Sequence, residues 1–125
     1  MSMNKGKYVD GFVISIPVKK TSEYKKIAKE AMGVWKKFGA LDYKECILED
    51  AKPKFVTLTF GKLVKPKPGE TVWFSFITFK SRQHRDQVNK KVMAYFDQKY
   101  GKNGMSMPFD MQRFSYGGFK VEVGL

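Results

Sequence analysis

The sequence predicts one α+β domain in which two helices alternate with four strands, and three observations support this. The chain has 125 residues, which is the usual length of a single domain. Hydrophobic residues make up 42% of it and aromatic residues 15%, too many for intrinsic disorder and enough for a packed core. Finally, two segments repeat apolar residues every three to four positions, whereas others concentrate β-branched and aromatic residues.

The chain begins with a strand and a helix. Tyr8 to Ile16 is rich in β-branched and aromatic residues and is closed by Pro17, which favours a strand. We expect Thr21 or Ser22 to cap a helix that ends at Gly39, where a left-handed conformation is favoured. The inward stripe of this helix comprises Tyr24, Ile27, Ala28, Ala31, Val34, Trp35 and Phe38.

A second strand and a long connection follow. Leu41 to Leu48 alternates apolar and polar residues well enough to form a strand. The connection runs from Glu49 to Glu70 and contains a candidate short strand at Phe55 to Phe60. It ends in the turn Lys65-Pro66-Lys67-Pro68-Gly69, the least structured part of the sequence.

The second half repeats the pattern of strand, helix and strand. Thr71 to Phe79 is the clearest strand, and Ser81 is predicted to cap a helix over Arg82 to about Tyr100. A loop, Met105 to Asp110, leads to a last strand, Gln112 to Val123, which we expect Gly117-Gly118 to interrupt with a bulge. Residues 1–125 therefore form one domain of βαββαβ order, the ferredoxin-like plan.

Two strands are apolar on both faces, which predicts a partner subunit. Thr71 to Phe79 carries Trp73 and Ile77 on one side and Phe74 and Phe76 on the other. Two helices cover only one face of a four-stranded sheet, so something must cover the second. A second copy of the sheet is the simplest cover and gives a homodimeric α+β barrel. The alternative is that the connection Glu49 to Glu70 folds back over the sheet.

The net charge of +12 invites a nucleic-acid hypothesis, but the kinds of basic residue weaken it. Of 24 basic residues only three are Arg, the type that reads bases and clamps phosphates. Many Lys residues fall on the predicted outer faces of the helices, where charge serves solubility. Non-specific binding of RNA or another polyanion through these helices stays open as the alternative function.

His84 and the three arginines are the candidate site. His84 is the only histidine and faces inward near a helix start, so it is a candidate proton-transfer residue; a buried structural histidine is the alternative. Arg82 and Arg85 flank it, and Arg113 follows Asp110. The predicted ligand-binding residues are Asp10, Arg82, Arg85, Asp110, Arg113 and Tyr116. The alternative is that these arginines pair with nearby acids to fix the structure.

Other groups give weaker signals. Cys46 is predicted to be a small buried residue within its strand, and one cysteine excludes an intramolecular disulfide. Asp42, Glu45, Glu49 and Asp50 offer carboxylates, but acids at strand ends are common. No metal or cofactor motif occurs. The polar start of the chain and the lack of long apolar runs predict a cytoplasmic protein without membrane contact.

Several strings, taken together, resemble a known family. They are Tyr8-Val9-Asp10-Gly11-Phe12, Gly39-Ala40-Leu41-Asp42-Tyr43, Lys80-Ser81-Arg82-Gln83-His84-Arg85-Asp86-Gln87-Val88-Asn89, Met107-Pro108-Phe109-Asp110 and Tyr116-Gly117-Gly118-Phe119. From about Tyr8 to Val123 the chain resembles the YbaA-like family of small bacterial proteins of unknown function. The resemblance implies the dimeric α+β-barrel superfamily, whose members use the barrel cavity for many purposes, so it implies no reaction.

These observations lead to one functional expectation. The chain is predicted to be a cytoplasmic homodimer that binds a small molecule, an anion among the candidates, in the cavity of the barrel. Whether it is an enzyme stays open at this point. In the sharpest form of the hypothesis, His84 moves a proton and the arginines orient the ligand.

Overall fold

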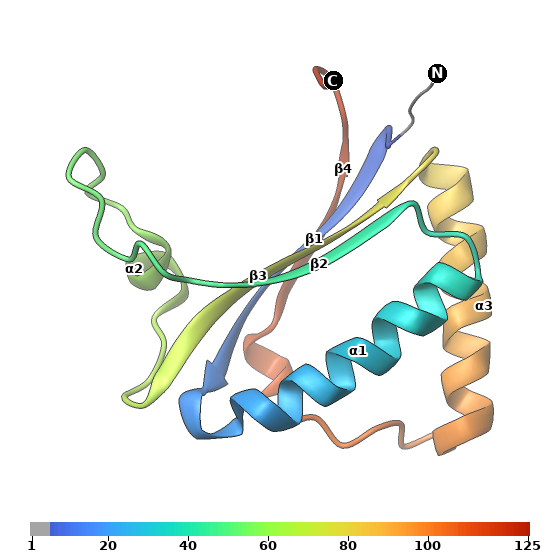
Figure 1. Ribbon diagram of the computed structural model, residues 1–125, viewed down its shortest axis with the longest axis horizontal. Helices are drawn as coiled ribbons and strands as arrows, with labels where there is room; N and C mark the ends of the chain where they lie inside the picture. Colours follow the sequence, from blue (N-terminus) through green and yellow to red (C-terminus); the bar gives the residue numbers. More distant parts are fainter. Residues whose placement is uncertain (1–5) are drawn as a thin grey trace.

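The computed structural model describes residues 6–125 and has the mixed α+β architecture that the sequence predicts (Figure 1). Two long helices lie on one side of a four-stranded sheet, and a short helix lies in the connection that leads from β2 to β3 (Figure 1). The elements in chain order are β1 (Tyr8–Pro17), η1 (Val18–Lys20), α1 (Thr21–Lys37), β2 (Asp42–Ile47), α2 (Phe60–Val64), β3 (Glu70–Phe79), α3 (Arg82–Tyr100), η2 (Met111–Arg113) and β4 (Ser115–Lys120).

The sheet has the strand order β2-β3-β1-β4, and every neighbouring pair is antiparallel. β1 and β3 are the central strands and pair along their whole length, from Tyr8 opposite Phe79 to Pro17 opposite Glu70. The two strands that the sequence marks as apolar on both faces are therefore the two that have a neighbour on each side.

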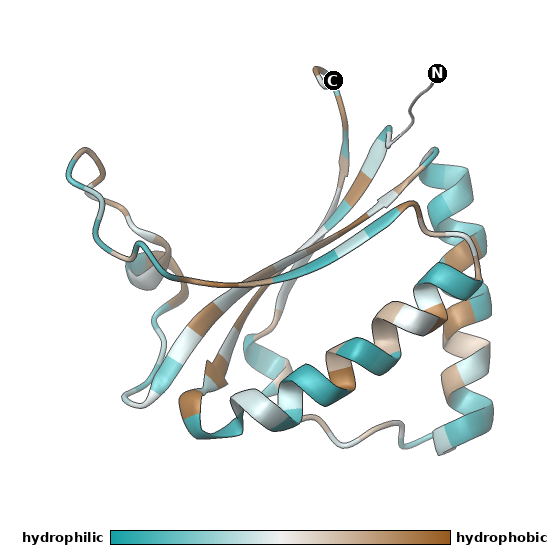
Figure 2. Cartoon of the chain, viewed as in Figure 1, coloured by the Kyte–Doolittle hydropathy of each residue, from teal (hydrophilic) through white to brown (hydrophobic). Residues whose placement is uncertain are grey.

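The core lies between the sheet and the two long helices, both of which alternate hydrophilic and hydrophobic residues along their length (Figure 2). One cluster joins α1 to the sheet, and another joins both α3 and the end of α1 to it. The first comprises Ile14, Ile16, Tyr24, Ala28 and Trp73, and the second comprises Val34, Ile77, Phe79, Val88 and Val92. Burying such side chains contributes on the order of 1.5–3 kcal/mol each.

The opposite face of the sheet is covered only in part. α2 packs against β1 and β3, so the connection does fold over one end of this face. Farther along, Phe74 is 45% exposed and Phe119 is 61% exposed. We call this uncovered area, comprising Phe74, Phe76 and Phe119, the open face.

The predicted helix boundaries are correct except at the start of α1. The Ser81 hydroxyl accepts a hydrogen bond from the His84 N–H at 3.0 Å, as a cap should, and Gly39 has a φ of 113°. The cap predicted at Thr21 or Ser22 is wrong. Lys20 occupies the cap position without a side-chain cap bond, and the Thr21 hydroxyl donates to the Val18 carbonyl at 2.7 Å.

Two predicted strand features are also wrong. Phe55 to Phe60 forms no strand; the segment is irregular until α2 begins at Phe60. β4 is shorter than predicted, since η2 occupies Met111–Arg113, and it has no bulge. The two glycines instead make room for side chains. A Cβ at Gly118 would lie 2.5 Å from the Tyr8 hydroxyl and 2.9 Å from the Arg85 guanidinium, and the Phe119 ring lies against Gly117.

Candidate functional site

A cavity of about 550 Å³ lies between the helix-covered face of the sheet, the two long helices and the segment 103–111. Its volume falls within the range of about 300–1,000 Å³ that is typical of small-molecule sites. The residues that line it are Phe12, Ile14, Tyr24, Ile27, Ala28, Ala31, Trp35, Tyr43, Glu45, Ser75, Ile77, Met93, Phe96, Asn103, Gly104, Met105, Met107, Phe109, Met111 and Phe114.

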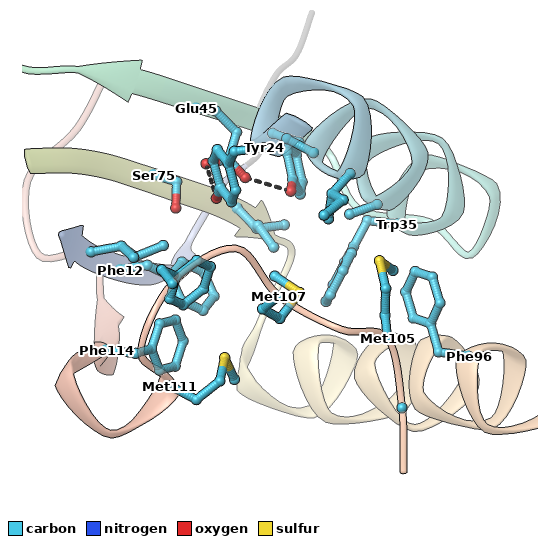
Figure 3. Close-up of a pocket in the computed structure, with 18 of the residues that line it drawn as sticks. Phe12, Tyr24, Trp35, Glu45, Ser75, Phe96, Met105, Met107, Met111 and Phe114 are labelled. Carbon is cyan, nitrogen blue, oxygen red and sulfur yellow. Dashed lines mark hydrogen bonds between the residues drawn. The ribbon is translucent and has the colours of Figure 1, made fainter. Parts of the chain in front are cut away.

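The lining is mainly aromatic and sulfur-containing. Figure 3 shows Phe12 and Phe114 on one side of the cavity, Trp35 and Phe96 on the other, and Met107 between them. Aromatic rings and methionines are large apolar surfaces, and methionine adapts to ligands of different shape. The cavity is therefore suited to the apolar body of a small molecule.

β2 places one carboxyl group in this apolar setting. Successive side chains of a strand point to opposite faces, so Tyr43 and Glu45 share the helix-covered face, while Lys44 and Cys46 lie on the other. Glu45 is opposite Ser75 of β3, and both line the cavity. The polar group thus comes from the regular sheet and not from a loop.

Two tyrosine hydroxyls hold the Glu45 carboxyl. Tyr24 of α1 donates to Glu45 Oε1 at 2.8 Å, and Tyr43 donates to Glu45 Oε2 at 2.7 Å (Figure 3). Ser75 lies opposite Glu45 on β3 and also lines the cavity. The carboxyl is therefore fixed in position by two neutral donors, the tyrosine hydroxyls.

Burial raises the pKa of Glu45 above its ordinary value of 4.5, and the hydrogen bonds from Tyr43 and Tyr24 offset this only in part. Burial and the neighbouring Glu45 raise the pKa of both the Tyr24 and Tyr43 hydroxyls far above their usual value. The two tyrosines therefore remain protonated donors at any physiological pH. A carboxyl group with a raised pKa in a cavity is a typical feature of functional sites.

A second polar cluster lies deeper, under the start of α3. Asp10 is fully buried and accepts a hydrogen bond from Arg85 at 2.6 Å and one from the Asn89 amide at 3.3 Å. Asn89 in turn accepts from the Trp35 indole N–H at 3.0 Å, and Trp35 lines the cavity. This cluster, which we call the Asp10–Arg85 cluster, thus supports one wall of the cavity without facing into it.

The predicted site residues are brought together only in part. Arg85 contacts Asp10, Asp86 at 2.8 Å and the Tyr116 hydroxyl at 2.5 Å, so three of the predicted ligand-binding residues form one cluster. Burial lowers the pKa of Arg85, but its bonds to Asp86 and Asp10 outweigh this and raise it. Burial and the nearby Asp10 raise the pKa of Tyr116 to about 12. These contacts correspond to the structural alternative for Arg85.

The other predicted residues lie apart from this cluster. Arg113 pairs with Glu70 at 2.8 Å, Asp110 accepts from the Gln112 N–H at 2.9 Å, and Arg82 is exposed. His84 Nδ1 accepts from the Lys80 N–H at 3.0 Å, and the ring packs edge-on against Phe79. Burial, with Lys80 nearby, lowers the pKa of His84. None of the seven predicted residues lines the cavity, and their roles toward a ligand stay predictions.

From the sequence, Glu45 is only one of several acids near strand ends, and Cys46 is predicted to be buried. Cys46 is exposed on the open face and not buried, so the prediction of a buried thiol is wrong. The alternation of side-chain direction along β2 is the sequence signal that could have placed Glu45 on the helix-covered face. If Tyr43 faces the helices, Glu45 must do so as well. Among the described residues no group of three or more His, Cys, Asp or Glu side chains is placed to hold a metal ion.

Comparisons with known proteins give a clear family and no activity. A family described as "Protein of unknown function (DUF1428)" matches residues 7–111. Two relatives, the uncharacterized protein YbaA of Escherichia coli strain K12 and that of Shigella flexneri, are each 42% identical over 114 residues. Each match covers 91% of this chain and 95% of the relative.

Two solved structures are similar at low identity. The de novo designed protein Foldit4 gives a TM-score of 0.44 at 9% identity and covers 92% of this chain and 98% of its own. A Bacillus cereus protein related to NIF3 gives 0.41 at 10% identity and covers 98% of this chain and 27% of its own. Within residues 6–125, none of the helices is both long and apolar enough to span a membrane. Because the family model matches most of its length, the chain belongs to the DUF1428 family, and the YbaA proteins are its relatives.

Proposed function

We propose that this protein binds a small, mainly apolar molecule in the cavity between its sheet and its two long helices. One observation carries the proposal: a cavity of about 550 Å³ lined by aromatic and methionine side chains also holds a positioned carboxyl group, Glu45. Apolar walls with few, well-placed polar groups are the usual composition of a ligand site. The predicted small anion fits the cavity less well than a neutral or cationic molecule, because Glu45 is the charged group at its wall.

A neutral fluorescent probe tests this proposal directly. N-phenyl-1-naphthylamine brightens when it enters an apolar site, and we expect the wild-type protein to take it up. Ala31 of α1 lines the cavity, so Ala31→Phe should fill the space and reduce uptake. The matched control is Ala94→Phe on the exposed side of α3, which should leave uptake unchanged. Wild-type levels of uptake by Ala31→Phe, or no uptake by the wild type, would contradict the proposal.

We further propose that the protein is a homodimer that joins two open faces into the predicted ferredoxin-like dimeric barrel. The support is that the chain exposes two apolar surfaces. The first is the open face. The second is a group of exposed apolar side chains in the connection, which we call the arm. The arm comprises Phe55, Val56, Leu58, Phe60 and Leu63, which are 47–99% exposed. Apolar groups this numerous are unusual on a monomer surface.

The arm gives the dimer proposal a geometric basis. It lies beside the open face, at the end where α2 packs on β1 and β3, and extends beyond the sheet (Figure 1). In a symmetric pair each arm would cover the open face of the other copy, since a two-fold contact joins the same surfaces twice. The partner is therefore proposed to be a second copy of this chain.

Light scattering measures this association. We expect a dimer at micromolar concentration for the wild type and a monomer for Phe74→Asp, which places a charge in the centre of the open face. Met32→Asp is the control, because Met32 is similarly exposed, at 43%, but lies on α1. A monomeric wild type would refute the dimer.

The compartment that we propose for this protein is the cytoplasm, in keeping with the free thiol of Cys46.

The alternative of polyanion binding gains no support from the site. The lysines on the two long helices, among them Lys25, Lys29, Lys36 and Lys90, are exposed and dispersed, as solubilising residues are. Two of the three arginines are held by acids: Arg85 by Asp10 and Arg113 by Glu70. Of the three arginines, only Arg82 is therefore not held by one of these two acids and could contact a phosphate.

A further inference from the structure

The hydrogen bonds around Glu45 indicate what kind of polar group the cavity accepts. Each tyrosine hydroxyl has one proton to donate, and both Tyr24 and Tyr43 donate theirs to the carboxyl. The Trp35 indole N–H is used by Asn89. When Glu45 is a carboxylate, Glu45 and the two tyrosines therefore present oxygen lone pairs to a ligand at this position. The polar end of the cavity therefore provides hydrogen-bond acceptors, and it favours a ligand that carries a hydrogen-bond donor.

The charge of the lining points to the same kind of ligand. Among the described residues that line the cavity, Glu45 alone has a side chain that is ordinarily charged in water, and that charge is negative. Burial without a cation disfavours this charge, as its raised pKa indicates. A bound cation would offset the free-energy cost of the buried negative charge, whereas a bound anion would increase it. Arg85, the cation of the Asp10–Arg85 cluster, does not balance the charge of Glu45, because it is held by Asp10 and Asp86.

The apolar walls favour a cation as well. The cavity exposes the rings of Phe12, Trp35 and Phe96 and the side chains of four methionines, Met93, Met105, Met107 and Met111. Aromatic faces attract cations, and the attraction is strongest where water is excluded from the contact. An ammonium group attached to an apolar body would match both parts of the site.

We propose that the natural ligand is a small amine with an apolar or aromatic body, whose ammonium group donates hydrogen bonds to Glu45 and to the oxygens of Tyr24 and Tyr43. This inference rests on the proposed binding function of the same cavity and names its ligand class. Glu45 is then the counter-ion of the ligand. The two tyrosines position the carboxyl and keep both of its oxygens directed at the ligand.

Three probes of matched shape test the ligand class. They are 4-phenylbutylamine, 4-phenylbutan-1-ol and 4-phenylbutanoate, which share a phenyl ring and a four-carbon chain and differ in their polar end. Titration calorimetry with the 125-residue chain at pH 7.5 gives the three dissociation constants. We expect the amine to bind about tenfold more tightly than the alcohol, since a hydrogen bond between two charged groups is stronger than one made by a neutral hydroxyl. The carboxylate should bind most weakly.

Variants assign the preference to Glu45. Glu45→Gln keeps the size of the side chain and should bring the amine and the alcohol within about threefold of one another, a fold-change that corresponds to less than one hydrogen bond to a charged group. Glu49→Gln is the matched control, because Glu49 is an exposed acid just beyond β2 and does not line the cavity. It should preserve the tenfold preference.

The outcomes separate the two proposals. If none of the three probes binds, the proposed binding function fails and the ligand class fails with it. If the alcohol or the carboxylate binds as tightly as the amine, the cavity is a binding site but the amine proposal is wrong. An amine preference that survives in Glu45→Gln would also refute the role of Glu45. The wild-type series alone decides the ligand class even if Glu45→Gln does not fold.

Discussion

Two carboxyl groups, Asp10 and Glu45, point to the helix-covered side of the same sheet, yet their surroundings differ. Asp10 is fully buried, and its charge is matched by the Arg85 guanidinium at 2.6 Å. Glu45 faces a cavity and is held by neutral hydroxyls. A carboxyl paired with a cation serves the fold, whereas one without a cation stays available to a ligand. This difference separates the structural cluster from the candidate site.

The largest expected effect is the loss of Asp10. Asp10→Ala leaves the Arg85 side chain, which is 11% exposed, without its buried partner. We expect the free energy of unfolding to fall by about 3–5 kcal/mol, because the mostly buried Arg85 charge then keeps only its exposed partner, Asp86. Urea denaturation measures this change. The control is Asp86→Ala, which removes the exposed partner of Arg85 and should cost less than about 1 kcal/mol. Equal losses for the two variants would show that burial of the pair is unimportant.

A smaller effect is expected where β4 makes room for the Asp10–Arg85 cluster. Gly118→Ala would place a methyl group 2.5 Å from the Tyr8 hydroxyl and 2.9 Å from Arg85, so both must move. Such overpacking typically costs about 1–3 kcal/mol. Thermal unfolding measures the loss. In the control, Gly33→Ala on α1, the new methyl group meets no atom within 4 Å, and it should stabilise the helix by about 0.5–1 kcal/mol. A stabilising Gly118→Ala would contradict this account of the cluster.

The next smaller effect is expected when one of the two tyrosine hydroxyls that hold Glu45 is removed. Tyr43→Phe deletes the donor to Glu45 Oε2 and leaves that oxygen without it in an apolar setting. We expect a loss of about 1–2 kcal/mol at a pH well above the folded pKa of Glu45, where its carboxylate accepts this bond, and a smaller loss near pH 4. Urea denaturation at the two pH values tests this. A loss that does not depend on pH would mean that packing, and not the hydrogen bond, is the cause.

Glu45→Gln should have the smallest effect, and its sign should depend on pH. The folded protein holds the Glu45 proton more tightly than the unfolded chain does, because its pKa is raised. The contribution of Glu45 to the free energy of unfolding is therefore at its maximum below about pH 4.5, and it is lost as pH rises through the folded pKa. Relative to the wild type, Glu45→Gln should gain stability across that window. A relative loss of stability with rising pH would indicate a lowered pKa at Glu45.

Much of the fold followed from local patterns, but the site did not. The periodicity of β3 and α3, the cap at Ser81 and the left-handed Gly39 depend on neighbouring residues and were predictable. The Gly117-Gly118 pair forms no bulge, because the role of Gly118 depends on Tyr8 and Arg85, which are distant in the sequence. The apolar residues of Phe55 to Phe60 favour a strand by their local pattern, but the segment has no strand partner among the described residues and is irregular up to α2.

The candidate site was missed for a related reason. Histidine and arginine are rare in this chain and therefore stand out in the sequence, whereas Glu45 is one of several acids. Its significance comes from Tyr24, a residue 21 positions away on another element, and from the surrounding cavity. Only the assembled structure brings these groups together. The contact between Arg85 and Asp10, 75 positions apart, has the same origin.

The most direct test of the difference between the two carboxyls is a pH titration of Glu45 by carbon NMR on the labelled 125-residue chain. Assignment follows from the signal that disappears in Glu45→Gln. We predict that Glu45 titrates above its ordinary value of 4.5 in the free protein. Saturation with 4-phenylbutylamine should then lower its pKa, because a bound cation stabilises the carboxylate. A free-protein pKa at or below 4.5 would contradict the claim that Glu45 is an uncompensated carboxyl.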